Sequence, residues 1–206
     1  MRILSGWSAT ATARLGRTSE NGKSTNVRRL ADSLDRIKTP HAFIGSANQE
    51  LSIERRADHL GIAAKGSGDV RLVESGLLPR EDKDKGGTTR TIYYAKAGRS
   101  ETVARLDLEL VPTTSNGNVF VLSFRGAPLP KTSVTVFGPP KWEKPIETDE
   151  QGRITVPSPW SGRYVLEVVH FEEKSGETGR EKFDRTRHIA TLSFVNTKGQ
   201  PWRVKP

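Results

Sequence analysis

Two histidines are the residues best spaced for chemistry in this chain. His170 lies near the end of one run of alternating apolar residues and His188 near the start of the next, and the two are symmetric about residue 179. If the two runs form an antiparallel hairpin in that register, the histidines fall opposite each other, with Cβ atoms about 4.5–5.5 Å apart. At that separation two imidazoles are close enough to share one ion.

Carboxylates near the pair complete a candidate metal site. Glu172 and Asp184 are nearby oxygen donors. Neutral imidazoles with a carboxylate suit divalent transition metals, so the predicted ligands are His170, His188, Glu172 and Asp184, and the predicted ion is nickel, cobalt, copper or zinc. Such a site weakens as pH falls through the titration range of histidine. Two alternatives stay open: the histidines cap the core and bond to backbone groups, or they bind another polar ligand, and in neither case is a cofactor needed.

Motifs for other chemistry are absent from the sequence. It has no His-Glu-x-x-His, no Gly-x-Ser-x-Gly, no P-loop and no dinucleotide-binding glycine pattern. Its zero cysteines exclude disulfide scaffolds, thiol catalysis, thiolate zinc sites and iron–sulfur clusters. Any metal must therefore be held mainly by nitrogen and oxygen.

Alternating apolar and polar residues predict the strands that position the histidines. Turn signals rich in glycine, proline and asparagine separate the runs. The expected strands cover residues 103–110, 119–124, 132–137, 144–148, 153–156, 164–171 and 188–195. In the first of them, Glu109 falls on the polar face of a half-buried strand. Seven short strands in this order indicate an all-β fold, an antiparallel immunoglobulin-like β-sandwich at the C-terminus.

The first half of the chain is less regular. We expect it to be mostly β, with a short helix near 26–38, where apolar residues follow helical spacing. Gly98-Arg99-Ser100 is a plausible hinge, which divides the chain into a basic N-terminal region, 1–99, and a sandwich domain, 100–206. The formal net charge is +9, and most of the excess lies in the first half.

This charge has several interpretations. A basic excess can indicate nucleic acid, an acidic membrane surface, or only solubility. The sequence has no run of five or six like charges and no RNA-binding signature, so a nucleic-acid partner is disfavoured. It also has no apolar stretch near the roughly 20 residues of a transmembrane helix. A leader peptide is not visible, because the residues after Met1-Arg2-Ile3-Leu4 are too polar for one.

An ordered set of motifs resembles one protein family. The segments are Gly126-Ala127-Pro128-Leu129 with Val134-Thr135-Val136, Thr148-Asp149-Glu150-Gln151-Gly152-Arg153, Gly162-Arg163-Tyr164, Val169-His170 and Ala190-Thr191-Leu192-Ser193-Phe194. Together they resemble the uncharacterised exported family grouped with the periplasmic auxiliary component of nickel and cobalt uptake systems. The resemblance covers roughly residues 75–195.

The resemblance implies a periplasmic or extracellular protein that is not an enzyme. We expect a binding or accessory role, with acquisition of a nickel- or cobalt-type metal as the leading function. A membrane transporter or an outer-membrane receptor is the implied partner. Two alternatives remain open. One is a structural adhesion or assembly module that contacts another protein, or a second copy, through sheet edges or the basic half. The other is binding of acidic polymers through that half.

Overall fold

The chain forms an all-β protein, as its alternating pattern predicts. The computed structural model describes residues 9–10, 37–46, 48–56, 59–64, 67–139 and 142–202. In these segments the regular elements are strands, and none of the residues is helical. Nor do these segments hold any long apolar helix of the kind that crosses a bilayer.

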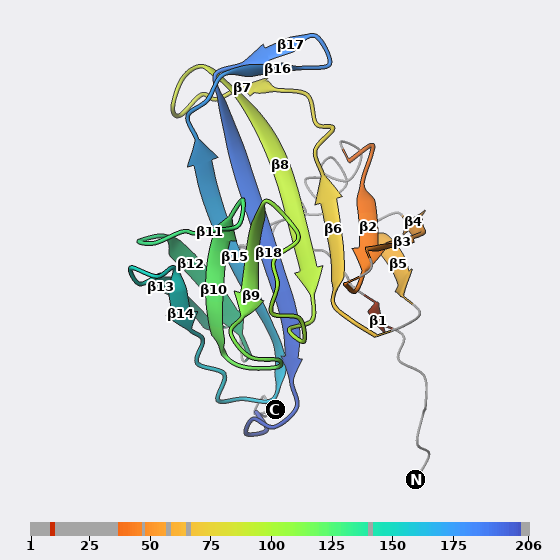
Figure 1. Cartoon of the computed structure of the whole chain (residues 1–206), viewed down its shortest axis with the longest axis vertical. Helices are drawn as coiled ribbons and strands as arrows, with labels where there is room; N and C mark the ends of the chain where they lie inside the picture. Colours follow the sequence, from red (N-terminus) through yellow and green to blue (C-terminus); the bar gives the residue numbers. More distant parts are fainter. Residues whose placement is uncertain are drawn as a thin grey trace, which may run out of the picture.

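A nine-stranded sheet forms the centre of the molecule (Figure 1). Its order is β13-β12-β15-β18-β8-β6-β2-β3, and β7 also pairs with β8. The strands are β2 (His41–Ile44), β3 (Gln49–Leu51), β6 (Val70–Glu74), β7 (Arg80–Glu81), β8 (Thr88–Ala97), β12 (Ser133–Gly138), β13 (Trp142–Glu147), β15 (Gly162–Glu172) and β18 (Arg185–Asn196). The longest strands, β8, β15 and β18, are neighbours, so they form its middle.

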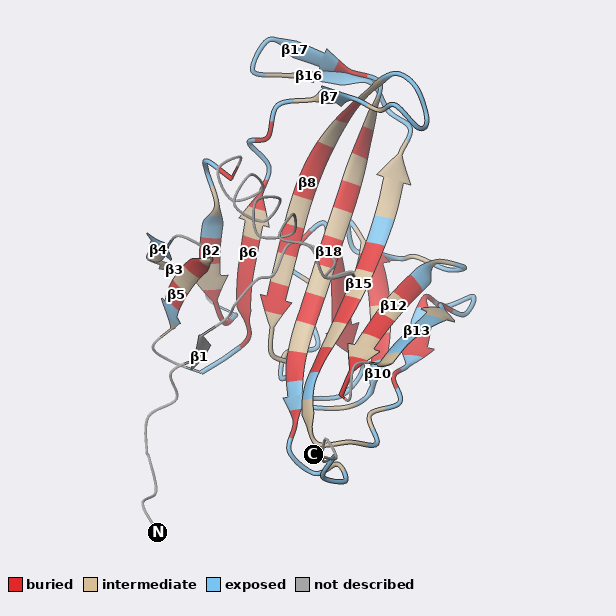
Figure 2. Cartoon of the chain, turned by 180° about the vertical axis from the view of Figure 1, so that it is seen from behind, coloured by how far each residue is buried: buried red, intermediate tan, exposed pale blue. Residues whose placement is uncertain are grey.

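A second sheet covers one face of the long sheet. It contains β9 (Leu108–Pro112), β10 (Val119–Phe124), β11 (Ala127–Pro128) and β14 (Arg153–Thr155). Inward-facing side chains of both sheets form the main core, in which Phe120 and Leu122 of β10 pack with Tyr164, Leu166 and other residues of the long sheet. These four side chains are fully buried. Burial therefore follows the alternation that is visible along β15 and β18 in Figure 2.

A third, small sheet covers part of the opposite face. It contains β1 (Ala9–Thr10), β4 (Ile53–Arg55) and β5 (Leu60–Ala64). Leu60 and Ile62 form a second core with Val70 and Leu72 of β6. Arg71 lies between Val70 and Leu72 in β6, and its side chain points to the opposite face of the sheet, because successive side chains of a strand alternate. The long sheet is thus covered on both faces where β6 lies.

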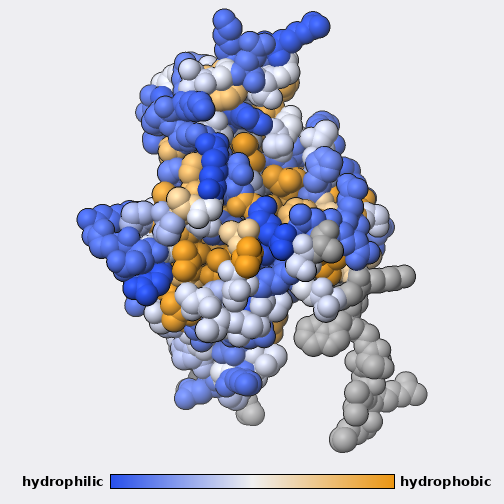
Figure 3. Space-filling model, in the orientation of Figure 1, coloured by the Kyte–Doolittle hydropathy of each residue, from blue (hydrophilic) through white to orange (hydrophobic). Residues whose placement is uncertain are grey.

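A hairpin of β16 (Gly176–Thr178) and β17 (Glu181–Phe183) extends the β15–β18 pair. Its two turn residues, Gly179 and Arg180, have φ values of 56° and 72°. Positive φ at both central residues is typical of the type I′ turns that connect two-residue hairpins. The tip therefore lies where the sequence placed the midpoint, and this end of the molecule is hydrophilic in the face shown in Figure 3.

Most predicted strands of the second half are confirmed. The strand predicted at 119–124 is β10, and those predicted at 132–137, 144–148, 153–156, 164–171 and 188–195 each fall on one strand. The first half is also mostly β where it is described. The predicted helix near 26–38 lies outside the described residues, except for Ile37 and Lys38, which are not helical.

The prediction of a half-buried strand at 103–110 is wrong in two respects, namely where the strand begins and which of its residues face the solvent. β9 begins only at Leu108, and all five of its residues are buried, Glu109 included. Glu109 Oε2 accepts the backbone N–H groups of Arg105 (2.6 Å) and Leu106 (2.9 Å). The chain therefore curls around this carboxylate instead of running straight into the strand.

One strand pair differs from a purely antiparallel arrangement. β18 lies antiparallel to β15 but parallel to β8. After β8 the chain forms the strands of the second sheet and also β12, β13 and β15 of the long sheet. Only then does β18 return beside β8, in the same direction. Because β8 precedes residue 99 and β18 follows it, the long sheet crosses the division predicted at 99/100. That domain boundary itself stays a prediction.

Candidate functional site

The β15–β18 ladder places the two histidines opposite each other. His170 pairs with His188 in the antiparallel register, and their ring centroids are 6.2 Å apart. The register predicted from the sequence is therefore confirmed. Phe124, the last residue of β10, packs against both rings, at 4.6 Å from His170 and 4.9 Å from His188. The pair thus lies at the end of the main core, between the two facing sheets.

His188 is fully buried and has a partner at each ring nitrogen. Its Nδ1 lies 3.0 Å from the hydroxyl of Tyr94, and the two rings are stacked. Its Nε2 lies 3.4 Å from Oε2 of Glu172. These partners fix the orientation of the imidazole at the end of the core, but both are side chains and not the backbone groups that the capping interpretation expects.

His170 is more open. The structure describes no hydrogen bond of its ring with another described residue, and its side chain is only partly buried. Burial lowers the pKa of His170 and of His188, and the nearby carboxylate of Glu172 only partly opposes this effect. Both imidazoles are therefore neutral near pH 7, which is the form that binds metals.

Glu172 is brought to the pair, but it is shared with a cation. Arg125 Nη1 and Nη2 donate to its two carboxylate oxygens at 2.6 and 2.9 Å. Hydrogen bonds from Arg125 lower the pKa of Glu172. Arg125 Nε also lies 3.6 Å from Asp107 Oδ2. An ion at the histidines would have to compete with this guanidinium for the carboxylate.

Asp184 lies elsewhere in the fold. Its Oδ2 accepts the backbone N–H of Thr88 at 2.6 Å and so ties the start of β18 to the start of β8. Four residues of extended chain separate it from His188, a distance of about 13 Å at 3.3 Å per residue. The structure therefore brings together three of the four predicted ligands and places Asp184 with Thr88.

The donor types fit a divalent transition ion, because two neutral imidazoles and a carboxylate form a recognised ligand set. The arrangement is not closed, however. In the part of the chain that the structure describes, no three His, Asp or Glu side chains are grouped so that they could hold an ion as they stand. Binding would require Glu172 to leave Arg125.

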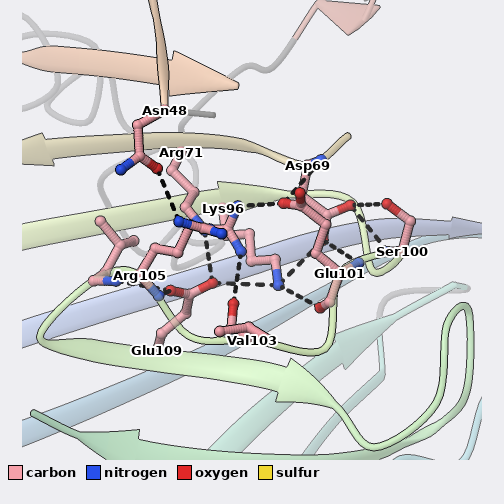
Figure 4. Close-up of polar contacts among 10 residues, drawn as sticks. Asn48, Asp69, Arg71, Lys96, Ser100, Glu101, Val103, Arg105 and Glu109 are labelled. Atoms are coloured by element: carbon pink, nitrogen blue, oxygen red, sulfur yellow. Dashed lines mark hydrogen bonds and ion pairs between the residues drawn. The ribbon is translucent and has the colours of Figure 1, made fainter. Parts of the chain in front are cut away.

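A second cluster, which sequence reasoning missed, is the buried ion network between β6, β8 and β9 (Figure 4). It consists of Asp69, Arg71, Lys96, Glu101 and Glu109. The side chains of Arg71, Lys96, Asp69 and Glu109 are 0%, 2%, 2% and 1% exposed, and that of Glu101 is 19% exposed. Two cations and three carboxylates are thus enclosed between the sheets.

The two cations of the network link its three acids. Arg71 Nε donates to Glu109 Oε1 at 2.9 Å, and its Nη1 donates to Glu101 Oε2 at 2.5 Å. Lys96 Nζ lies 3.1 Å from Asp69 Oδ2 and 3.3 Å from Glu109 Oε1. A buried charge is tolerated only when it is paired and hydrogen-bonded. The network meets this condition at every carboxylate.

Asp69 accepts three hydrogen bonds in addition to its ion pair with Lys96. Its Oδ1 accepts the N–H (2.9 Å) and the hydroxyl (2.7 Å) of Ser100, and its Oδ2 accepts the N–H of Glu101 (3.1 Å). Burial raises the pKa of Asp69, but Lys96 and these donors together outweigh it, so the pKa lies below its usual value.

No local pattern in the sequence marks this network. Arg71 lies between Val70 and Leu72, and Lys96 lies between two alanines. Glu109 alternates with leucines as a solvent-facing residue would. Their pairing depends on which strands become neighbours, β6 with β8 and both with the β9 segment. The one available signal is that a charge occupies a position in β6 and β8 between apolar residues.

Comparison of the chain with protein-family models, with curated proteins and with solved structures finds no match in any of the three. The family resemblance of the motifs stays a prediction.

Proposed function

We propose that this protein is a non-catalytic accessory protein that binds a divalent transition metal through His170 and His188. The observation that carries the proposal is the direct pairing of the two histidines in the β15–β18 ladder. Further support comes from their neutral state and from the carboxylate of Glu172 beside His188. In this proposal the facing sheets form an immunoglobulin-like sandwich, and the protein works outside the cytoplasm with a membrane transporter or an outer-membrane receptor.

The proposed site changes its partners when the ion binds. His170 offers a ring nitrogen without a hydrogen bond to a described residue, and His188 offers Nε2 once it releases Glu172. Glu172 turns from Arg125 toward the ion and supplies an oxygen ligand. Tyr94 keeps its hydrogen bond to Nδ1 of His188, because a partner at the second nitrogen orients a ligating imidazole. Arg125 is therefore a competitor of the metal.

Isothermal titration calorimetry with nickel, cobalt, copper and zinc tests this proposal. We expect saturable binding of at least one ion, and we expect His170→Ala and His188→Ala to weaken it at least tenfold. Arg125→Gln should tighten binding, because it frees the carboxylate of Glu172. His59→Ala is the matched control and should leave the affinity unchanged.

Two results would count against the proposal. The first is the absence of saturable binding for all four ions. The second is binding that persists in the double variant His170→Ala, His188→Ala, since that would place the ion elsewhere. Circular dichroism of each variant checks that lost binding is not lost folding.

A further inference from the structure

The buried ion network holds an amine and a carboxyl group in position for a covalent reaction. We propose that Lys96 and Asp69 condense to an intramolecular amide between Lys96 Nζ and Asp69 Cγ, with the loss of one water molecule. The cross-link would join the end of β8 to the residue that precedes β6. It is independent of the metal proposal, because it lies in a different cluster.

Lys96 and Asp69 lie close together in an enclosed site. Lys96 Nζ lies 3.1 Å from Asp69 Oδ2, and each side chain is 2% exposed. Groups held in this way react with effective concentrations far above those in solution, about 10⁵ M or more for well-oriented pairs. The same burial shields the product amide from hydrolysis. The reaction needs no reagent from outside this cluster.

Hydrogen-bond donors already surround the oxygen of Asp69 on which negative charge develops. Asp69 Oδ1 accepts the N–H and the hydroxyl of Ser100. Fixed donors of this kind stabilise the oxyanion of a tetrahedral intermediate. Gly98 allows this approach, because a Cβ at that position would overlap Asp69 Oδ1. The turn at 98–101 thus packs closely against the carboxyl group of Asp69, which the amine of Lys96 would attack.

A carboxylate that can accept a proton lies beside the amine of Lys96. Glu109 Oε1 lies 3.3 Å from Lys96 Nζ, and its side chain is 1% exposed. Its other oxygen is held by the N–H groups of Arg105 and Leu106, which fixes the carboxylate in place. A positioned carboxylate within hydrogen-bond reach of a nitrogen can take and return its proton.

The reaction balances with the groups present. Lys96 passes one proton to Asp69 Oδ2, which leaves a neutral amine facing a neutral acid. The lone pair of Nζ then forms a bond to Cγ, and the C–O π pair moves onto Oδ1. Glu109 takes a second proton from the nitrogen and returns it to the Oδ2 hydroxyl. That oxygen leaves as water when the pair on Oδ1 re-forms the carbonyl.

The energetics favour the product once the ion pair has formed. Two buried charges become one neutral amide, which removes their cost of desolvation. Arg71 remains paired with Glu101 and Glu109, so the rest of the network stays complementary. Because the pKa of Asp69 lies below its usual value, the protonated acid that the amine attacks is a minor form of this side chain. The condensation is accordingly slow and follows folding.

Intact-mass measurement of the purified, denatured full-length chain tests the inference directly. We expect a mass lower than the sequence mass by one water. Proteolysis should yield a branched peptide in which Lys96 resists trypsin and is joined to the peptide that contains Asp69. An unmodified mass after prolonged incubation of folded protein overturns the proposal, and so does a water loss that maps to another position.

Substitutions separate the roles. Lys96→Arg keeps the charge but should show the full sequence mass, and Glu109→Gln should abolish or greatly slow the loss of water. Asp69→Asn should still react, now with loss of ammonia, and give the same mass as the cross-linked natural chain. Cross-linking at an undiminished rate in Glu109→Gln would contradict the role of Glu109. If a variant fails to fold, the mass of the unsubstituted chain still decides.

Discussion

At the scale of single residues, Gly98 determines how closely the turn at 98–101 approaches Asp69. Its φ is 108°, a backbone conformation that residues with a Cβ rarely adopt. The absent side chain leaves room for Asp69 Oδ1, on which the donors of Ser100 converge. This one residue therefore controls both backbone strain and the integrity of the ion network.

We expect Gly98→Ala to destabilise the protein by about 3–5 kcal/mol. Backbone strain accounts for about 1–3 kcal/mol, and displacement of the Asp69 carboxylate from its donors adds to it. Chemical denaturation followed by tryptophan fluorescence measures the change in the free energy of unfolding.

Gly86→Ala is the matched control for this prediction. Gly86 has a φ of 69°, and a Cβ there would meet nothing within 4 Å. It should therefore cost only the strain of a left-handed residue, about 1–2 kcal/mol. Equal losses in the two variants would show that the Asp69 contact contributes nothing.

The two clusters differ in how far single residues could be predicted. The His170–His188 pair follows from one hairpin, so symmetric spacing was sufficient to place it. Glu109 was assigned to a solvent-facing position because its neighbours alternate, although its partners lie on other strands. The alternation of apolar and polar residues predicts on which face of a strand a side chain lies, but it does not predict which other strands pack against that face.

At the scale of elements, β13 is the edge strand at one end of the long sheet. Four of its six residues are exposed, and the strand includes Glu143, Lys144, Pro145 and Glu147. Charges and a proline without an N–H are features by which natural sheets discourage strand addition. Assembly of copies through this edge is accordingly disfavoured.

We expect the double variant Lys144→Thr, Pro145→Thr to self-associate more than the natural chain. It restores a backbone donor and removes a charge from the open edge, which then resembles a strand able to pair. Size-exclusion chromatography with light scattering measures the mass in solution. The matched control Pro130→Thr, Lys131→Thr makes the same changes in the segment before β12. Association that is equal in the two variants would contradict the role of the edge.

Strand positions were more predictable than strand partners. β10 and β12 were located by alternation because each strand buries one face in the main core between the two sheets. The strand predicted to begin at residue 103 begins only at Leu108, because the carboxylate of Glu109 accepts the backbone N–H groups of Arg105 and Leu106. The parallel pairing of β8 with β18 has no signal in the local sequence, because it joins residues 96 positions apart, such as Thr91 and Arg187.

At the scale of the whole molecule, one continuous sheet connects the two halves of the chain. β8 contributes Ile92 and Tyr94 to the main core and lies between β18 and β6. The ion network adds a second connection, because Arg71 and Lys96 precede residue 99 while Glu101 and Glu109 follow it. Removing the first half would therefore expose a side of β18 and leave buried acids without cations.

We expect a fragment of residues 100–206 not to fold cooperatively, in contrast to the full chain. In the fragment, His188 loses Tyr94, β18 loses its parallel neighbour, and Glu109 loses Arg71 and Lys96. An uncompensated buried charge alone costs about 3–5 kcal/mol, a large part of the roughly 5–15 kcal/mol that stabilises a typical protein. Thermal unfolding followed by circular dichroism, with an NMR spectrum of each species, makes the comparison. A fragment 100–206 with dispersed resonances and a cooperative transition would instead establish residues 99/100 as a domain boundary, and would show that the β8–β18 pairing joins two independently stable units.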